Sequence, residues 1–264
     1  MAKIIKKGNQ LEEEYYAIKR EQADKSAKNV RAFCKLAFVS FAIYGATITV
    51  SIVADILSIA FIPLTMCLGF VLLIAAFVYF AYDSLESDTD ILIAGINGER
   101  TATKVLSTLP DCYTVFQNVI VTYDNKKSEI DNIVVGRSGV FIVEVKNHNS
   151  LIEGDLRDVY WRQHKVGRGG TPYTDEMYSP VKQVGTQIYC LANYLRQNGV
   201  NTYIQGIVYF ANKSCFLSLT GDSDISVYAS SDSDEDRLCR QILLGNHNLD
   251  LRSINHICKL ISQL

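Results

Sequence analysis

The chain has 264 residues, of which 48% are hydrophobic, and a formal net charge of −2. This length accommodates a membrane segment and one domain of ordinary size, and the near-neutral charge excludes a global electrostatic attraction to nucleic acid. The seven cysteines are odd in number and scattered without paired spacing, so no zinc-type cluster is visible and a reducing compartment is favoured over a disulfide framework.

Residues 1–31 mix charges of both signs with few large apolar side chains. Such a composition is typical of a solvent-exposed face rather than of a packed core. We therefore expect a charged cytoplasmic segment, either a solvated helix or a loosely ordered tail.

Residues 32–82 are almost continuously apolar. A membrane span needs roughly 20 apolar residues, so this stretch predicts two transmembrane helices at about 34–53 and 60–82, joined by a turn near Asp55. The alternative is a buried helix pair, but both runs lack the polar face of a soluble helix. Lysines and arginines before the first span place the N-terminus in the cytoplasm. The expected localisation is a multi-pass inner or plasma membrane protein, held in the lipid bilayer with residues 83–264 cytoplasmic.

After a linker at 83–94, residues 95–264 alternate between helical and strand-like patterns. The helices are expected at 95–110, where Gly95 and Gly98 open the helix, at 179–199, where Ser179 is the N-cap, and at 231–246 and 251–264. The strands are expected at 112–123, 129–135, 140–146, 159–163 and 203–210, with a glycine-rich loop at 166–176. This order predicts an α/β fold, or α+β, in which a mixed sheet is flanked by helices.

The segment "EIDNIVVGRSGVFIVEVKN", residues 129–147, reads as a hairpin with its loop at 136–139. A constant pairing register sets Asp131 opposite Glu144 and Glu129 opposite Lys146. Because side chains alternate between faces, these four charged groups are expected to share one face. The other face then takes the apolar residues Ile130, Val134, Phe141, Val143 and Val145.

Two opposed carboxylates on neighbouring strands repel each other and need a cation or a proton between them. Hard oxygen ligands with open coordination positions suit Mg²⁺ or Mn²⁺, and such an ion activates water and neutralises phosphoryl charge. Lys146, two residues beyond Glu144, is placed to stabilise the transition state of phosphodiester hydrolysis. The alternative is an ordinary Glu129–Lys146 salt bridge, with the other two carboxylates at the sheet edge.

The same hairpin resembles the centre of the nuclease-related domain (NERD) family, a branch of the PD-(D/E)XK nuclease superfamily. "GINGERTATKVL" resembles the opening helix of that family, "LIEGDLRDVYW" its Gly-Asp…Trp segment, and "YSPVKQVGTQIYCL" its Pro-x-x-Gln helix. The similarity runs from about Gly95 through Phe210, with the four motifs in order. It implies a restriction-endonuclease-like core.

The resemblance assigns Asp131 and Glu144 as metal ligands and Lys146 as the catalytic lysine. It matches Glu99 to an acidic residue that is aimed at the same metal through water, and Gln183 to a glutamine that positions the substrate or the site. The sequence departs from the family pattern at two points. Ile130 stands where the superfamily motif has proline, and Gln187 stands where some relatives have tyrosine, which puts the role of Gln183 in doubt.

These features predict a membrane-anchored, Mg²⁺- or Mn²⁺-dependent nuclease that acts on nucleic acid, with DNA favoured over RNA by the resemblance. Two alternatives are a non-catalytic nucleic-acid-binding module and a scaffold that binds protein partners. The intact set of Asp131, Glu144 and Lys146 favours the enzyme, because a pure binding module has no need of opposed carboxylates.

Other polar and aromatic residues of the domain have two interpretations each. Trp161 is expected to pack the sheet rather than to stack on a base. His148 is expected at the surface. Five basic residues form either a phosphate-binding face or an ordinary solvated loop. These are Arg157, Arg162, Lys165, Arg168 and Lys182.

Overall fold

The computed structural model describes residues 1–8, 11–24, 92–167, 170–232 and 235–264, with short pieces between residues 27 and 75 (27–28, 31, 35, 38–39, 46, 69–71 and 74–75). The chain divides into two compact units. The first consists of Met1–Leu11 and Ala94–Leu264, and the second of Glu12–Ile93. In the second unit, residues 12–24 are helical. The fold described below is that of the first unit.

The predicted transmembrane hairpin is not supported. Among the described residues, no helix is long and apolar enough to cross a membrane. The helix α3 (Pro180–Gln197) has 18 residues but carries lysine, arginine, glutamine and asparagine side chains, which a bilayer would leave unsolvated. The predicted multi-pass localisation is contradicted by the same finding. Most residues of 34–53 and 60–82, and Asp55, lie outside the described part of the chain.

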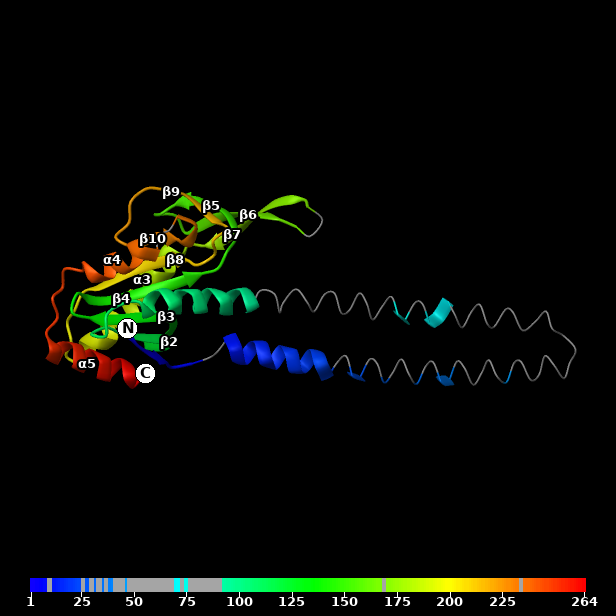
Figure 1. Cartoon of the computed structure of the whole chain (residues 1–264), viewed down its shortest axis with the longest axis horizontal. Helices are drawn as coiled ribbons and strands as arrows, with labels where there is room; N and C mark the ends of the chain where they lie inside the picture. The colour runs from blue at the N-terminus through cyan, green and yellow to red at the C-terminus, as the bar shows by residue number, and fades with distance from the viewer. Residues whose placement is uncertain are drawn as a thin grey trace, which may run out of the picture. The chain divides into compact units, whose positions relative to one another are not determined.

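A six-stranded mixed sheet forms the centre of the domain, with the strand order β1-β2-β3-β4-β8-β10 (Figure 1). Its strands are β1 (Lys3–Lys6), β2 (Thr114–Tyr123), β3 (Lys126–Gly136), β4 (Gly139–Lys146), β8 (Ile204–Phe210) and β10 (Ser226–Ala229). β2, β3 and β4 pair antiparallel, whereas β1 pairs parallel with β2 and β8 pairs parallel with β4. The expected mixed sheet is confirmed.

A second sheet of four strands has the order β7-β6-β5-β9. Its strands are β5 (Ser150–Asp155), β6 (Tyr160–Val166), β7 (Pro172–Tyr178) and β9 (Cys215–Thr220). β6 and β7 form an antiparallel hairpin that takes the place of the predicted glycine-rich loop. The sequence did not indicate β5, β7 or β9, because their residues are mostly exposed or only partly buried.

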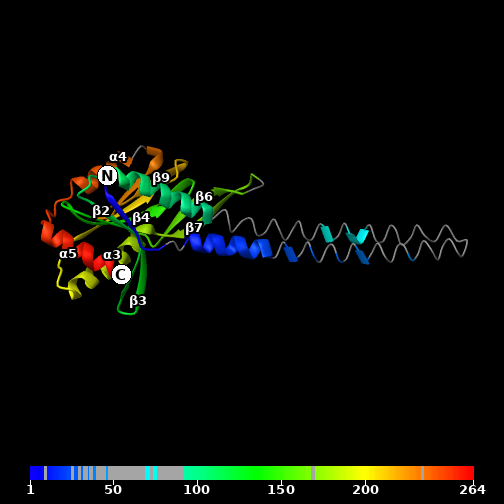
Figure 2. The ribbon, with the colours of Figure 1, turned by 60° about the horizontal axis from the view of Figure 1, so that its bottom comes forward.

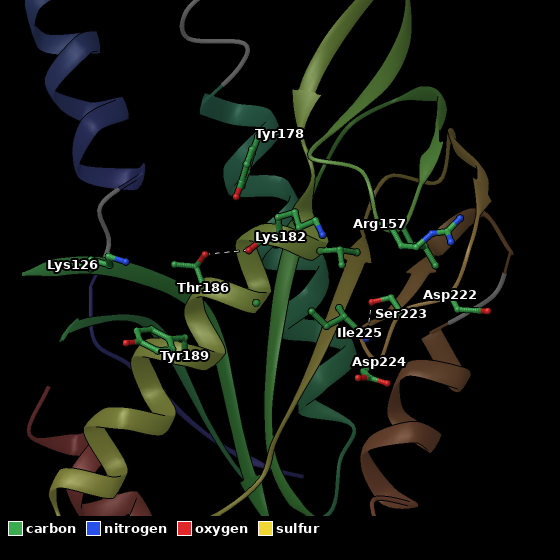
Figure 3. A pocket seen from close by; sticks show the side chains of 13 residues that line it. Lys126, Arg157, Tyr178, Lys182, Thr186, Tyr189, Asp222, Ser223, Asp224 and Ile225 are labelled. Atoms are coloured by element: carbon green, nitrogen blue, oxygen red, sulfur yellow. Dashed lines mark hydrogen bonds between the residues drawn. The ribbon is translucent and has the colours of Figure 1, made fainter. Parts of the chain in front are cut away.

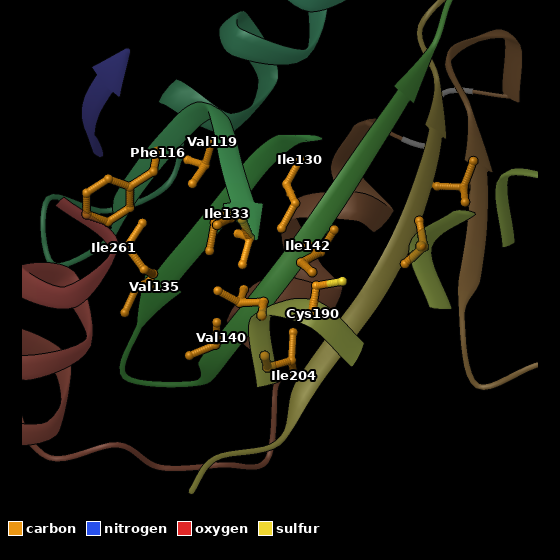
Figure 4. Packing of buried hydrophobic residues seen from close by; sticks show 14 of the residues in the cluster. Phe116, Val119, Ile130, Ile133, Val135, Val140, Ile142, Cys190, Ile204 and Ile261 are labelled. Atoms are coloured by element: carbon orange, nitrogen blue, oxygen red, sulfur yellow. The ribbon is translucent and has the colours of Figure 1, made fainter. Parts of the chain in front are cut away.

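Helices cover both faces of the six-stranded sheet (Figures 1 and 2). α3 and α5 (Leu251–Ser262) pack on one face, in a core that Figure 4 shows around Ile133, Ile142 and Cys190. The helical residues 92–107 and α4 (Glu235–Leu243) pack on the other face. The four helices expected in this domain are thereby confirmed, and a short 3-10 helix, η2 (Ser230–Asp232), precedes α4.

Two glycines allow the helices to approach the strand ends closely. A Cβ on Gly206 of β8 would lie 2.5 Å from a side-chain atom of Val184, so only glycine seats α3 at this distance. A Cβ on Gly98 would lie 2.7 Å from the Cβ of Asn147, directly after β4. Gly98 therefore lies inside the helix rather than opening it as predicted, and its role is close packing against the end of β4.

The N-terminal residues belong to this domain. Lys3–Lys6 form β1 at the edge of the sheet, in register from Lys3 opposite Thr114 to Lys6 opposite Gln117. The sequence predicted a helix or a loose tail here, because four residues, two lysines around two isoleucines, carry little periodic signal. The domain is thus built from two chain segments on either side of residues 12–93.

Candidate active site

The candidate site lies where β3 loses its regular alternation. Ile133 of β3 and Phe116 of β2 lie in the core beneath α3, and so do Ile130 and Val119, three residues away on each strand (Figure 4). A regular strand sends only every second residue to one face, so both strands shift by one between these positions. Asn118 adopts a positive φ of 54° within this shift, a conformation that asparagine tolerates better than most residues.

This shift corrects the predicted distribution of side chains on the hairpin. Ile130 was expected on the face opposite to the charged residues, but it lies in the same core as Ile133. Glu129 is exposed, and the alternative salt bridge from Glu129 to Lys146 is replaced by a pair between Lys146 and Glu144. The predicted register itself is confirmed over Asn132–Gly136, with Asn132 opposite Val143 and Ile133 opposite Ile142.

Asp131 marks the point at which β3 and β4 stop pairing. The ladder ends with Asn132 opposite Val143. The Asp131 carboxylate then accepts a hydrogen bond from the backbone N–H of Val145 through Oδ2, at 2.7 Å. A side chain therefore takes the place of a backbone acceptor, while β4 continues its pairing with β8. This arrangement fixes one carboxylate oxygen at the end of the ladder and leaves the other for a different partner.

Glu144 and Lys146 form a partly buried ion pair next to this point. Lys146 Nζ donates to Glu144 Oε1 at 2.7 Å, and the exposed fractions of the two side chains are 22% and 2%. Lys146 Nζ also donates to Gln183 Oε1 on α3, at 2.9 Å. The structure thus brings three of the residues named from the sequence into one hydrogen-bonded group, contributed by β4 and α3.

Gln187 is a member of this group that the sequence analysis noted only as a departure from the family pattern. Its side chain is 1% exposed, and Nε2 donates to Glu144 Oε2 at 2.7 Å and to the Glu129 carbonyl oxygen at 2.9 Å. Two acceptors around one nitrogen fix the orientation of the amide. A usable signal was present, because residues 183 and 187 are four apart and share one face of a helix.

Glu99 approaches from the other side of the sheet, on the helix of residues 92–107. Its Oε2 accepts a hydrogen bond from Asn118 Nδ2 at 3.4 Å, and the same amide donates to the Gly8 carbonyl oxygen at 3.1 Å. Its negative charge also raises the pKa of Asp131, although less than the other causes do. Glu99 therefore lies within electrostatic range of Asp131, and it is held there by Asn118, the residue at which β2 shifts.

Asp131 lies in an environment that disfavours its negative charge. Burial raises the pKa of the Asp131 carboxyl well above its usual range, and the nearby Glu144 charge raises it further. The Val145 N–H and the Lys146 ammonium lower this pKa, but they do not offset the increase. A site of this kind is stabilised by an additional proton or by a cation.

The oxygen donors of the candidate site can be set against the needs of a divalent ion. Across residues 92–167, 170–232 and 235–264 and the described N-terminal pieces, no three His, Cys, Asp or Glu side chains are arranged as a ready-made metal cluster. Gln187 Oε1, beside Glu144, is buried and accepts no hydrogen bond from these residues. Two carboxylates and an unsatisfied amide oxygen are hard oxygen donors, so the residues fit Mg²⁺ or Mn²⁺ with several water ligands.

The structure also places two other residues named from the sequence, His148 and Trp161. His148 is half-buried rather than at the surface as expected, and burial together with the Lys146 and Lys165 charges lowers its pKa to about 4. Trp161 is 1% exposed, and its Nε1 donates to the Asp155 carbonyl oxygen at 2.8 Å. The prediction that Trp161 packs the sheet is confirmed.

The fold and these side chains define an α/β domain with a buried acidic and basic group at the end of its central strands. Residues 94–211 match the family described as NERD, the nuclease-related domain, which confirms the resemblance and its extent. An uncharacterized protein of Bacillus anthracis is 39% identical over 71 residues, which cover 26% of this chain and 34% of that protein. The chain thus spans about a third of the length of that curated relative. No solved structure matches the chain.

Proposed function

We propose that the protein is a metal-dependent nuclease that hydrolyses phosphodiester bonds of nucleic acid, with DNA as the favoured substrate. The match of residues 94–211 to a nuclease-related domain indicates a nuclease-like function and an interaction with nucleic acid. The observation that carries the proposal is the hydrogen-bonded group of Lys146, Gln183 and the buried Glu144, next to an Asp131 carboxyl whose pKa is raised by burial. Strongly perturbed carboxyls beside a lysine are typical of catalytic sites.

Asp131 and Glu144 would hold the divalent ion, and Glu99 would contribute through water. When bound, Mg²⁺ or Mn²⁺ supplies charge neutralisation for a phosphoryl oxygen and lowers the pKa of water. The carboxylates are held rigidly for this task, since Asp131 Oδ2 is fixed by the Val145 N–H and Glu144 Oε2 by Gln187. Such fixed positions avoid reorganisation when charge develops.

Lys146 would stabilise negative charge on the phosphoryl group. An ammonium group has three N–H donors, and within the described residues Glu144 and Gln183 accept two hydrogen bonds from Nζ. The third donor is left for a phosphoryl oxygen. Gln183 acts as a positioning residue here, because its Oε1 keeps the ammonium aimed along the end of β4.

The test is cleavage of labelled single-stranded DNA, duplex DNA and RNA by the purified full-length chain, with Mg²⁺, Mn²⁺ or EDTA. We expect cleavage only with metal, and a loss of about 10²–10³-fold or more in the Lys146→Ala and Asp131→Asn variants. Lys104→Ala is the matched control, because Lys104 is an exposed lysine on the helix of residues 92–107. Metal-dependent cleavage that survives both site variants would refute the proposal, and so would the absence of cleavage of every polynucleotide.

A further inference from the structure

A groove of about 680 Å³ runs along the outer flank of α3 (Figure 3). We call it the α3 groove, and its chemically active lining consists of Lys126, Tyr178, Lys182, Tyr189, Asp222 and Asp224. Lys182, Thr186 and Tyr189 are spaced four and three residues apart, so they form one stripe on the helix. The α3 groove is therefore a feature of the helix that also carries Gln183 and Gln187.

The α3 groove and the candidate site share their framework. Lys182 precedes Gln183 directly, and Lys126 begins the strand that carries Asp131. Gln187 connects the two elements, because it donates to the Glu129 carbonyl oxygen on β3. A chain held in the α3 groove is thus held by the same helix and strand that position the catalytic group.

Cations and exposed aromatic rings line the α3 groove, and Lys126 and Tyr189 form one end of it. Tyr178 and Tyr189 are 49% and 48% exposed, and each ring makes one edge contact, with Tyr160 and Tyr123 respectively, that leaves much of its surface open. Tyr189 lies under the Lys126 ammonium, with 5.9 Å between Nζ and the ring centroid, and Figure 3 shows these two side chains on the same side of α3. Exposed rings beside lysines are the combination on which unpaired bases stack while phosphates are neutralised.

The opposite end of the α3 groove is acidic. Asp222 and Asp224 lie there in Figure 3, together with Arg157, whose guanidinium is held by the Asp155 carboxylate at 2.9 Å. Carboxylates repel phosphates, so a duplex, which presents a phosphate surface on both strands, suits this groove poorly. Carboxylates accept hydrogen bonds from the amino groups of bases, and these are open to side chains when the bases are unpaired.

We propose that the α3 groove binds an unpaired nucleic-acid strand, with phosphates near Lys126 and Lys182, bases on Tyr178 and Tyr189, and base amino groups toward Asp222 and Asp224. This inference rests on the proposed function and narrows its substrate to nucleic acid with a single-stranded segment. The α3 groove guides that segment toward the group of Glu144 and Lys146.

The binding test uses the full-length chain in EDTA, so that no cleavage intervenes, with a fluorescent 20-nucleotide single strand and the duplex of the same sequence. We expect the single strand to bind at least about tenfold tighter than the duplex. Tyr178→Ala and Tyr189→Ala should each weaken single-strand binding by about tenfold, and Tyr189→Phe should restore it, because stacking needs the ring and not the hydroxyl. Tyr203→Ala is the matched control, since Tyr203 is 52% exposed and outside the α3 groove.

Lys182→Ala tests the phosphate contact separately. Removal of one phosphate contact from a single strand lowers the slope of log affinity against log salt by about 0.7. A chain of deoxycytidines should also bind more tightly than a chain of thymidines, because of these two bases only cytosine has an exocyclic amino group. An Asp222→Ala, Asp224→Ala double variant should reduce this ratio, and an unchanged ratio would overturn the placement of the bases.

The inference is overturned if the duplex binds as tightly as the single strand, or if the two tyrosine variants bind like Tyr203→Ala. These outcomes are separable from a failure of the proposed function. If the tyrosine variants lose binding but the native chain shows no metal-dependent cleavage, the proposed strand binding in the α3 groove stands and the proposed nuclease activity is refuted. If cleavage depends on Lys146 but the tyrosine variants bind like the native chain, the proposed nuclease activity stands and the proposed strand binding in the α3 groove is refuted.

Discussion

The two sheets of the domain each contain a lysine–carboxylate pair of similar length but opposite environment. In the six-stranded sheet, Lys146 contacts Glu144 at 2.7 Å, and the carboxylate is 2% exposed. In the four-stranded sheet, Lys165 contacts Asp175 at 2.9 Å, with exposed fractions of 29% and 56%. Exposed pairs contribute about 0–1 kcal/mol, whereas a buried charge is costly unless every contact is made. Burial, and not the pair itself, therefore distinguishes a site from an ordinary surface.

The largest expected difference comes from removal of the two lysines. Lys146→Ala should lower the free energy of unfolding by about 3–5 kcal/mol, because it leaves Glu144 buried without its cation. Lys165→Ala should change it by about 1 kcal/mol or less. Urea denaturation of both variants measures the difference. Equal losses would show that the environment of Glu144 is as well solvated as that of Asp175.

Two buried glutamines sharpen the comparison. Gln187 donates to Glu144, and Gln163 of the second sheet, 3% exposed, donates to the Asn149 carbonyl oxygen at 3.1 Å. Substitution of either by leucine should cost about 1–3 kcal/mol, because an acceptor loses its donor. Only Gln187→Leu should also reduce cleavage, by about 10–100-fold, since only Gln187 orients a proposed metal ligand. If Gln163→Leu reduces the cleavage rate as much as Gln187→Leu does, the lower cleavage rate of Gln187→Leu comes only from its lower stability.

Asp131→Asn should raise the stability, by less than Lys146→Ala lowers it. A carboxyl whose pKa is raised in the folded state favours folding at low pH, and this contribution is lost as the pH rises through the folded pKa. In metal-free buffer at pH 8 we therefore expect a higher Tm for Asp131→Asn than for the native chain. The difference should shrink as the pH falls toward about 4, the ordinary pKa of aspartate. Thermal melts across this range measure it, and a native chain that is the more stable at pH 8 would contradict it.

His148→Gln should give the smallest effect, confined to acid pH. The His148 pKa is lowered to about 4, so the folded state holds the ring neutral and loses stability as the pH falls below about 6.5. Between pH 7 and pH 5, the Tm of the native chain should fall more steeply than that of the variant. His164 lies in the second sheet and is 41% exposed, and His164→Gln is the matched substitution at an exposed histidine.

The predictable parts of the fold are those whose pattern is local. β4 was predicted from its apolar run and α3 from its amphipathic stripe, and both patterns can be seen within a short stretch of sequence. β7, with the sequence PYTDEMY, has almost no buried residue, so its strand conformation comes from backbone pairing with β6. No periodic signal in the sequence corresponds to that pairing.

For the candidate site, the proximity of several residues was predictable from the sequence, but its geometry was not. The hairpin register placed Asp131, Glu144 and Lys146 near one another because pairing follows from the turn. The shift of β3 is accompanied by the left-handed residue Asn118 in the neighbouring strand β2, and the hydrogen bond of Gln187 joins it to a carboxylate 43 positions away. Such distant pairings are settled only when the helix docks on the sheet.

The parallel pairing of β1 with β2 determines when this domain can be completed during synthesis. Lys3 leaves the ribosome before residues 12–93 are made, whereas its partner Thr114 emerges only after them. The nascent N-terminal strand therefore has no sheet to join for most of that interval, and closure over so long a loop delays folding. A chain that begins at Ala94 would leave the edge of β2 uncovered and open to pairing with another molecule.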